Sequence, residues 1–387
     1  MTTEILNLSL NEEQEAILQT VRKITKDVVE PQATEIDKKG EYPYEIMKIF
    51  AKEGLLALPL PKEYDGLGES LIVLCKVVEE IAKADMSCAM IVATHCLGSF
   101  PMDLMATEEQ KQKYFPKLAA GELLSAIAMS EPDAGSDLAS LKTKAVKDGD
   151  YYILNGEKRW ITNAGVADLY VVFARTSQEN KKAKGISAFI VEKETPGFSI
   201  GRKEDKLGAR GSVTGDLIFQ DCKIHKNQLM GEEGKGFILA MQSLNKERPI
   251  AASLALGVAE GAIEYSTNYA KERVQFGKPI ADFQAIQFML ADMKIQVETA
   301  RLLLYQAALK AEAKTPDATL YSSMCKTYAS DVAMKVTTDA VQILGGYGCT
   351  REYPVERMMR DAKITQIFAG TNQIQRIVIA REMLQEK

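Results

Sequence analysis

The sequence predicts a mixed α and β protein in three parts. We expect an α-helical domain at residues 1–124, a β-barrel or β-sandwich domain at 125–234, and a four-helix-type bundle at 235–387. Apolar residues recur every three or four positions in the first and last parts, which favours helices. In the middle part, short alternating segments bounded by turn residues favour strands. This order of helices, strands and helices is unusual and narrows the choice of folds.

Two capping signals mark helices in the first part. Asn11 and Gln14 precede an amphipathic run, and Thr107 and Gln110 repeat the same pattern, as expected of side chains that cap a first helical turn. The segments 71–84 and 87–97 lie between these signals and are strongly apolar. They predict helices that are buried or that line a pocket.

The middle part predicts strands. Residues 151–154 and 157–162 flank the dipeptide Asn155-Gly156, and Asn-Gly favours the two-residue turn of a β-hairpin. Residues 179–182 are polar and charged, and we expect them to form an exposed loop. Further short strands are expected at 169–174, 186–191, 198–200 and 216–219.

The last part is expected to be helical from Gly236 onward. Apolar residues between Phe283 and Val297 recur at helical spacing, and further helices are expected at about 322–344 and from Thr371. Pro249 is expected to bend or interrupt the first helix of this part, because proline lacks an N–H donor and crowds the preceding turn.

Composition limits the possible functions. The chain has 387 residues, of which 46% are hydrophobic and 26% charged, and its net charge is −5. No run of like charge suggests a nucleic-acid partner. No apolar stretch reaches the length expected of a membrane span, and the N-terminus lacks the pattern of a targeting segment, which favours a bacterial cytoplasm. Six scattered cysteines and only two histidines argue against a metal site or a disulfide framework.

Five segments carry a resemblance to a known family. They are AIAMSEPDAGSD at 126–137, WITN at 160–163, KERVQFG at 271–277 followed by Gln284, QILGGYG at 342–348, and RDAKITQIF at 360–368 followed by GTNQ at 370–373. In this order and at this spacing they resemble the acyl-CoA dehydrogenase family over the whole chain. The resemblance implies an FAD-dependent enzyme that dehydrogenates an acyl-CoA thioester between its α and β carbons to the 2-enoyl-CoA.

The resemblance also implies which residues bind FAD. Each motif has a simpler interpretation as well: residues 131–137 could be a polar turn, the single tryptophan a core residue, Arg273 part of a surface charge cluster, and the paired glycines a helix end. Since the family shares FAD sites between subunits, part of the set is expected to serve a neighbouring chain. The set is Ile127, Ala128, Met129, Ser130, Gly135, Ser136, Trp160, Ile161, Thr162, Arg273, Gln284, Gln342, Ile343, Leu344, Gly345, Gly346, Thr371, Asn372 and Gln373.

The catalytic base departs from the commonest family pattern. Most relatives carry a glutamate before the Gly-Thr of the last motif, whereas the residue here is Ala369, which cannot accept a proton. The isovaleryl-CoA and long-chain branches place their base one residue before an arginine, on the first helix of the C-terminal domain. Glu247 precedes Arg248 at that position, so the resemblance implies that Glu247 is the base. The simpler alternative is a solvated glutamate in a Lys-Glu-Arg run.

The same resemblance implies the residues that contact the substrate. Ala369 keeps its backbone N–H, which in the family helps to hold the thioester oxygen and so acidifies the α proton. No metal is expected to take part. The expected substrate contacts are Ser136, Asn245, Arg248, Ala369 and Gly370.

The acyl group is expected to be short, branched or alicyclic, because small residues such as Ala89, Ala93 and Gly98 would widen its pocket. The resemblance further implies electron-transfer flavoprotein as the electron acceptor and a homotetramer. Three alternatives stay open: an enoyl-CoA reductase working in the reverse direction, a flavin- and CoA-binding protein that has lost its base, and a dehydrogenase that uses Asp85 as its base. An oxidase that uses dioxygen is less favoured, since acyl-CoA oxidases are typically longer chains.

Overall fold

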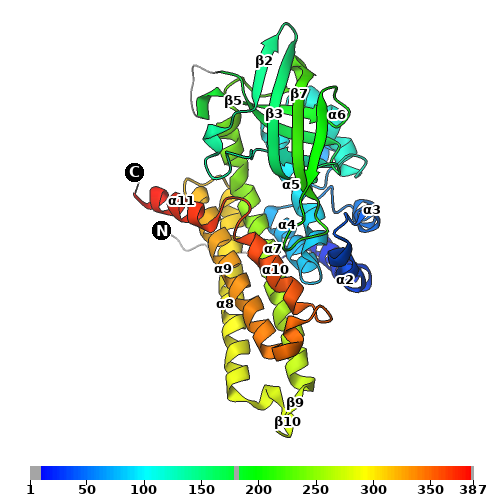
Figure 1. The fold of residues 1–387 in the computed structure, drawn as a ribbon, viewed down its shortest axis with the longest axis vertical. Helices are drawn as coiled ribbons and strands as arrows, with labels where there is room; N and C mark the ends of the chain where they lie inside the picture. Colours follow the sequence, from blue (N-terminus) through cyan, green and yellow to red (C-terminus); the bar gives the residue numbers. More distant parts are fainter. Residues whose placement is uncertain (1–9, 178–182, 385–387) are drawn as a thin grey trace.

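The computed structural model describes residues 10–177 and 183–384. The expected loop at 179–182 therefore lies outside the described residues. Figure 1 shows an elongated molecule with a β-sheet domain at one end and a long helical bundle at the other. The helices of the N-terminal part lie beside the region where the sheet domain meets the bundle.

The N-terminal part is helical, as predicted. Both capping boxes are confirmed: the side chains of Asn11 and Thr107 accept from the N–H of Gln14 and Gln110, and the two glutamines bond back to the capping residues. The helices are α1 (Glu12–Ile24), α2 (Glu30–Lys39), α3 (Tyr44–Lys52), α4 (Leu71–Ala82), α5 (Met86–Met105) and α6 (Glu108–Ala119), with a π-helical turn, Thr25–Val29, between α1 and α2.

Helix α5 corrects one expectation about membranes. Within the described residues, its 20 residues are long and apolar enough to cross a bilayer, although no stretch of that kind was expected from the sequence. However, 78% of its apolar window is buried inside the protein. The apolar character of α5 is therefore explained by its place in the core, where it contacts α7, α4 and strand β1 (Ser125–Ala128).

The middle part is one eight-stranded sheet. Its hydrogen-bonded order is β6-β7-β3-β2-β4-β5-β8, and β1 pairs in parallel with β4. Strands β6 and β8 lie at the two edges of this path. After β1, the strands are β2 (Lys144–Asp148), β3 (Tyr151–Thr162), β4 (Leu169–Arg175), β5 (Ile186–Glu192), β6 (Phe198–Lys203), β7 (Thr214–His225) and β8 (Leu229–Met230).

The predicted hairpin at Asn155-Gly156 is wrong. These residues lie inside the single strand β3, where the pairing with β7 shifts register between Leu154 and Gly156. The actual hairpin joins β2 to β3, with Asp148 paired to Tyr151. A Cβ at position 156 would lie 2.8 Å from the Cα of Thr143, so the glycine here permits a close backbone approach at a bulge rather than a turn.

The C-terminal part is a bundle of long helices, as predicted. A small hairpin, β9 (Val274–Gln275) with β10 (Lys278–Pro279), lies at the far end of the bundle from the sheet (Figure 1). The helices are α7 (Gly236–Glu272), α8 (Gln284–Glu312), α9 (Ala318–Leu344), α10 (Val355–Thr365) and α11 (Asn372–Leu384).

Pro249 does not interrupt α7, which runs through it without a break. Proline cannot donate to the carbonyl four residues earlier, which here is that of Asn245. The hydroxyl of Ser322 on α9 donates to this carbonyl at 2.8 Å. A neighbouring helix therefore supplies the hydrogen bond that the proline removes.

Replacing Ser322 with Ala should lower the free energy of unfolding by about 1–2 kcal/mol, because the Asn245 carbonyl would be left without a donor. In a Pro249→Ala background the new N–H can take that carbonyl, so the same change should cost much less. Urea unfolding midpoints of the four chains would measure this coupling. Ser266→Ala is the matched control, since Ser266 donates to carbonyls within its own helix. Equal costs of Ser322→Ala in both backgrounds would contradict this explanation.

The three parts pack as one body. A single core cluster contains residues of both helical parts, including Val78, Leu256 and Val332. The sheet domain is fixed against α10, because the N–H of Ala209 donates to Oδ1 of Asp361 at 2.6 Å. A Cβ at Gly208 would lie 2.5 Å from the carbonyl oxygen of Arg360, so glycine is required at this contact.

Candidate functional site

Glu247 is buried in the first half of α7 and is only 4% exposed. Its Oε1 lies 2.8 Å from the Ser243 hydroxyl, one turn earlier on the same face. Burial raises the pKa of Glu247 to about 7, while the Ser243 hydroxyl and the charge of Arg248 oppose the shift. Ser243 can donate to the ionised carboxylate, or accept from the protonated acid and donate to the Ala240 carbonyl at 2.9 Å instead. The carboxyl group can therefore take or release a proton near neutral pH.

The neighbours of Glu247 leave polar atoms without partners. Among the described residues, Nε of Arg248 and Oδ1 of Asn245 are buried and form no hydrogen bond. The guanidinium of Arg248 is held by Nη1, which donates to the Ser323 hydroxyl at 3.2 Å. Buried polar groups are rarely left unpaired, so both atoms favour a polar ligand beside Glu247. Lys246 adds a further contact, with its ammonium 5.2 Å from the ring centre of Phe100 on α5.

One turn of α9 joins this part of α7 to the loop after α10. Ser322 and Ser323 contact Asn245 and Arg248, as described above. Lys326, one turn further along, donates from Nζ to the carbonyl of Gly370 at 2.8 Å and to Oδ1 of Asn372 at 2.9 Å. The segment with Glu247 and the loop with Ala369 are thus both fixed to the same stretch of α9.

The loop at Ala369 has an unusual backbone. Ala369 has φ of 52° and Gly370 has φ of 83°, a region that costs a non-glycine residue about 1–2 kcal/mol. Gln375 on α11 donates to the carbonyls of Ala369 at 3.0 Å and Gly370 at 3.2 Å. Within the described ranges, the N–H of Ala369 donates to no protein acceptor. It is a free donor on a loop whose carbonyls are already bonded.

Asp85 has a structural role at the other end of α5. It is the N-cap of that helix, is buried, and accepts from the N–H of Cys88 at 2.8 Å. Burial raises the pKa of its carboxyl group. Fifteen residues separate Asp85 from Phe100, which is roughly 22 Å of helix, and Phe100 lies beside Lys246. Asp85 is therefore distant from Glu247 and already used as a cap.

The first group of expected FAD residues lies on the sheet domain. Ile127 and Ala128 end β1, Met129 and Ser130 follow it, and the Ser130 carbonyl accepts from the N–H of Arg159 at 2.9 Å. The adjoining loop with Gly135 and Ser136 is exposed. A buried ion pair that the sequence did not signal holds this loop: Nζ of Lys158 lies 2.8 Å from Glu131 and donates to the Met129 carbonyl at 3.0 Å.

Trp160 lies beside this loop and is 56% exposed, although a lone tryptophan is more often buried. Its φ of 63° is a strained value for a bulky residue, and Ile161 next to it is buried. Thr162 ends β3 half-buried. Among the described residues, Oδ1 of Asn163 is buried without a hydrogen-bond partner. An exposed indole and an unpaired polar atom are what a planar, polar-edged ligand would use.

The second group of FAD residues lines a cleft at the far end of the bundle. The cleft has a volume of about 580 Å³, and its walls include Arg273, Ile343, Leu344, Gly345 and Gly346. The guanidinium of Arg273 lies 5.3 Å from the ring centre of Tyr347. A Cβ added at either glycine would meet no atom within 4 Å, so the backbone there is open to a ligand.

The remaining expected FAD residues are dispersed. Gln284 is exposed at the start of α8, and Gln342 is exposed on α9 one residue before the cleft. Thr371 caps α11 by accepting from the N–H of Ile374 at 3.3 Å, and Gln373 is exposed. The amide of Asn372 is fully bonded to Lys326, Ser330 and Asp331, so its side chain holds the loop together and has no donor left for a cofactor.

The two groups of FAD residues lie at opposite ends of one chain. Arg273 follows the last residue of α7, and Glu247 is 26 residues earlier, a separation of roughly 40 Å along the helix. Figure 1 shows the sheet domain and the β9–β10 hairpin at the two ends of the molecule. One chain therefore cannot bring both groups of expected residues to a single ligand.

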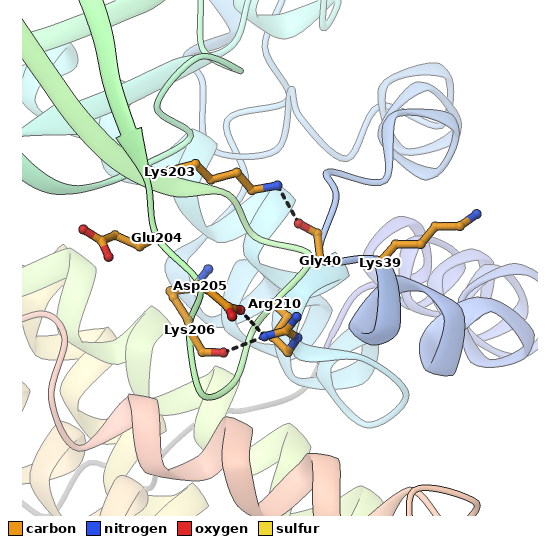
Figure 2. Close-up of a pocket in the computed structure, with 7 residues that line it drawn as sticks. All are labelled: Lys39, Gly40, Lys203, Glu204, Asp205, Lys206 and Arg210. Atoms are coloured by element: carbon orange, nitrogen blue, oxygen red, sulfur yellow. Dashed lines mark hydrogen bonds and ion pairs between the residues drawn. The ribbon is translucent and has the colours of Figure 1, made fainter.

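A second hollow, of about 210 Å³, lies between the end of α2 and the loop after β6. Figure 2 shows Lys203, Lys206 and Arg210 gathered there, with Lys39 and Glu204 directed away. Lys203 donates to the Gly40 carbonyl at 2.8 Å, and Arg210 donates to the Asp37 carbonyl at 2.9 Å. Cations commonly satisfy the last carbonyls of a helix. The end of α2 therefore explains Lys203 and Arg210, while Lys206 donates to the Ser212 carbonyl at 2.6 Å.

Several site residues escaped the sequence analysis. Ser243 could have been found, because it lies four residues before Glu247 on the same helical face. Ser322, Ser323 and Lys326 carry no local signal, since only the packing of α9 on α7 brings them to the site. The width attributed to Gly98 was wrong: a Cβ there would lie 2.4 Å from the Ser125 hydroxyl. Its small size lets β1 approach α5 and leaves no space for an acyl group.

The fold and the site together define a class of protein. It has a helical part, a sheet and a helical bundle, with a buried carboxylate in the bundle. The expected FAD residues are divided between the sheet domain and the far end of the bundle. Family models for the N-terminal, middle and C-terminal domains of acyl-CoA dehydrogenases match residues 11–122, 126–222 and 234–384. The chain belongs to the acyl-CoA dehydrogenase family.

Individual relatives are similar to this chain over almost its whole length. Cyclohex-1-ene-1-carbonyl-CoA dehydrogenase of Syntrophus aciditrophicus (strain SB) is 46% identical, over 97% of this chain and 91% of the relative. The structure of butyryl-CoA dehydrogenase from Megasphaera elsdenii has a TM-score of 0.95 at 43% identity, over 98% of this chain and 100% of that one. A structure described as the electron transferring flavoprotein of Acidaminococcus fermentans has a TM-score of 0.95 at 44% identity, with the same coverage.

Proposed function

We propose that this protein is an FAD-dependent acyl-CoA dehydrogenase that uses Glu247 as its catalytic base. The observation that carries the proposal is the placement of Glu247: a buried carboxyl group, beside unpaired atoms of Arg248 and Asn245, fixed to the same stretch of α9 as the Ala369 loop. Membership of the family supplies the reaction class.

The residues divide the work of proton removal. With a pKa of about 7, Glu247 is partly ionised at neutral pH and still basic enough to take a proton. The free N–H of Ala369 would donate to the thioester oxygen, where negative charge develops as the α proton leaves. Arg248 would provide a positive charge and a free Nε beside the same substrate. FAD, when bound, would accept the hydride from the β carbon.

The residues present fit FAD. Arg273 offers paired donors for a pyrophosphate, Gly345 and Gly346 leave their backbone open, and Trp160 exposes an aromatic face. Because these residues lie at opposite ends of one chain, we propose that each FAD is bound between two chains of a homotetramer. An apolar stripe at seven-residue spacing on α8, formed by Phe288, Ile295 and Leu302, is exposed in the single chain and supports such an assembly.

The proposed substrate is a short, branched or alicyclic acyl-CoA. Named relatives of this chain include dehydrogenases of cyclohex-1-ene-1-carbonyl-CoA and butyryl-CoA, which span the alicyclic and short-chain classes. Electron-transfer flavoprotein is the proposed electron acceptor, in keeping with the neighbour from Acidaminococcus fermentans.

The test is anaerobic mixing of the FAD-loaded protein with straight, branched and cyclic acyl-CoA thioesters while the flavin absorbance is followed. We expect bleaching with short, branched or alicyclic thioesters, in the presence of excess substrate. No bleaching with any thioester, despite tight binding, would favour the binding protein without a base. Reoxidation by enoyl-CoA that is faster than reduction by the matching acyl-CoA would favour the reductase direction.

A further inference from the structure

Lys326 is a buried lysine that the proposed proton transfer does not use. It is 1% exposed, and its ammonium donates to the carbonyl of Gly370 and the amide oxygen of Asn372. Within the described part of the chain it forms no ion pair with a carboxylate. Burial, and then the charge of Arg248, lower its pKa to about 7. A lysine placed at such a cost, with neutral acceptors only, calls for an explanation.

The partners of Lys326 belong to the loop whose N–H would hold the thioester oxygen. Ala369 and Gly370 are both left-handed. Gln375 on α11 donates to both of their carbonyls, and Lys326 on α9 donates to the carbonyl of Gly370. A Cβ at Gly370 would lie 2.6 Å from Nε2 of Gln375, so the loop is closely fitted to this donor. Two donors from two helices therefore fix the backbone immediately after the Ala369 N–H.

The hydrogen bonds of the loop offset its backbone strain. A left-handed conformation is unfavourable for alanine, and the bonds donated by Lys326 and Gln375 hold the loop in that conformation. Without the amino group of Lys326, the carbonyl of Gly370 would lose one of its two donors, and Ala369 could relax to an ordinary backbone conformation. Its N–H would then change direction, because φ sets the N–H relative to the rest of the residue.

We propose that Lys326 is a positioning residue, which holds the loop of Ala369–Thr371 so that the Ala369 N–H faces the thioester oxygen. This inference rests on the proposed function. Lys326 on α9 would thus set the orientation of the Ala369 N–H, which lies more than forty positions later in the chain. Lys326 would act through the backbone and would not touch the substrate.

The test uses acetoacetyl-CoA, a thioester with an acidic α proton whose ionisation can be followed by ultraviolet absorbance without any flavin reduction. The FAD-loaded parent should lower the pKa of the bound thioester, since the Ala369 N–H stabilises the enolate. Lys326→Met keeps most of the length of the side chain and removes its donors. We expect enolate binding to weaken at least tenfold, and flavin reduction by acyl-CoA to slow by about 10²-fold, as for loss of one oxyanion donor.

The matched control is Lys335→Met, because Lys335 lies on the same helix but is exposed and paired with Asp339. Binding of a thioether analogue, which has no carbonyl oxygen, should be the same in all variants. If Lys326→Met does not fold, Gln375→Met removes the other donor and should weaken enolate binding in the same direction.

Ionisation of acetoacetyl-CoA by Lys326→Met as strongly as by the parent would overturn the inference. If the parent itself neither ionises acetoacetyl-CoA nor bleaches with any acyl-CoA, the proposed function fails together with the inference. If the parent does both and the variant matches it, only the role of Lys326 is disproved.

Discussion

Glu247→Gln should reduce its flavin at least 10²-fold more slowly than the parent when mixed with the best acyl-CoA, since a positioned base contributes about 10²–10⁴ to the rate. The amide has nearly the same shape as the carboxyl group and can still bond to Ser243, so the variant should fold and bind the thioester. Stopped-flow absorbance without oxygen measures the rate, and the dissociation constant of the acyl-CoA measures binding.

The pH profile adds a second signature. The ionised form of Glu247 is the active one, so kcat/KM of the parent should fall as pH drops through about 7, the value to which burial raises its pKa. Glu264→Gln is the matched control, because Glu264 lies on the same helix but is exposed and pairs with Lys83. A Glu247→Gln protein that reduces its flavin at the parental rate would show that the base lies elsewhere.

Arg273→Met should weaken FAD binding roughly 10- to 100-fold, because a charge-assisted bond to a pyrophosphate is worth about 1.5–3 kcal/mol. FAD retention after gel filtration, followed by titration of the stripped protein with FAD, measures the loss. Lys271→Met, an exposed change two residues away, should retain FAD like the parent.

The separation of Arg273 from Glu247 also predicts complementation. In a mixed assembly of Glu247→Gln and Arg273→Met chains, some sites combine Glu247 of one chain with Arg273 of the other, and these sites are intact. Co-expressed variants should therefore show activity well above that of either variant alone. Differently tagged chains that co-purify without any recovered activity would contradict a site shared between chains.

The fold could be predicted from the sequence where local signals agree with long-range packing. The capping boxes at Asn11 and Thr107 and the helical periodicity around Val297 needed only neighbours a few residues away, and all three are confirmed. The Asn155-Gly156 turn failed because the long pairing of β3 with β7 outweighed a local turn preference. The expectation that no apolar stretch is long enough to span a membrane was wrong, because α5 is that long and apolar. Its apolar side chains are needed for packing inside the protein core.

The candidate site was predictable only in part, because long-range packing leaves no signal in the local sequence. Glu247 and Ala369 were found through motifs, and the structure adds that both depend on α9. Ser322 and Lys326 have no motif of their own, because their roles arise from contacts between residues more than forty positions apart. The proline in α7 shows this dependence most simply: its missing donor is visible in the sequence, but the hydroxyl that replaces it is not.

The exposed position of Trp160 gives the protein a built-in optical probe. It is the single tryptophan of the chain, so all indole emission comes from this one residue, which lies beside the loop that follows β1. An isolated chain with this residue 56% exposed would emit as an indole in water. A bound isoalloxazine ring would quench that emission by energy transfer, and a docked neighbour would shift it to shorter wavelength. Cofactor uptake and assembly could therefore be timed separately in an unlabelled sample.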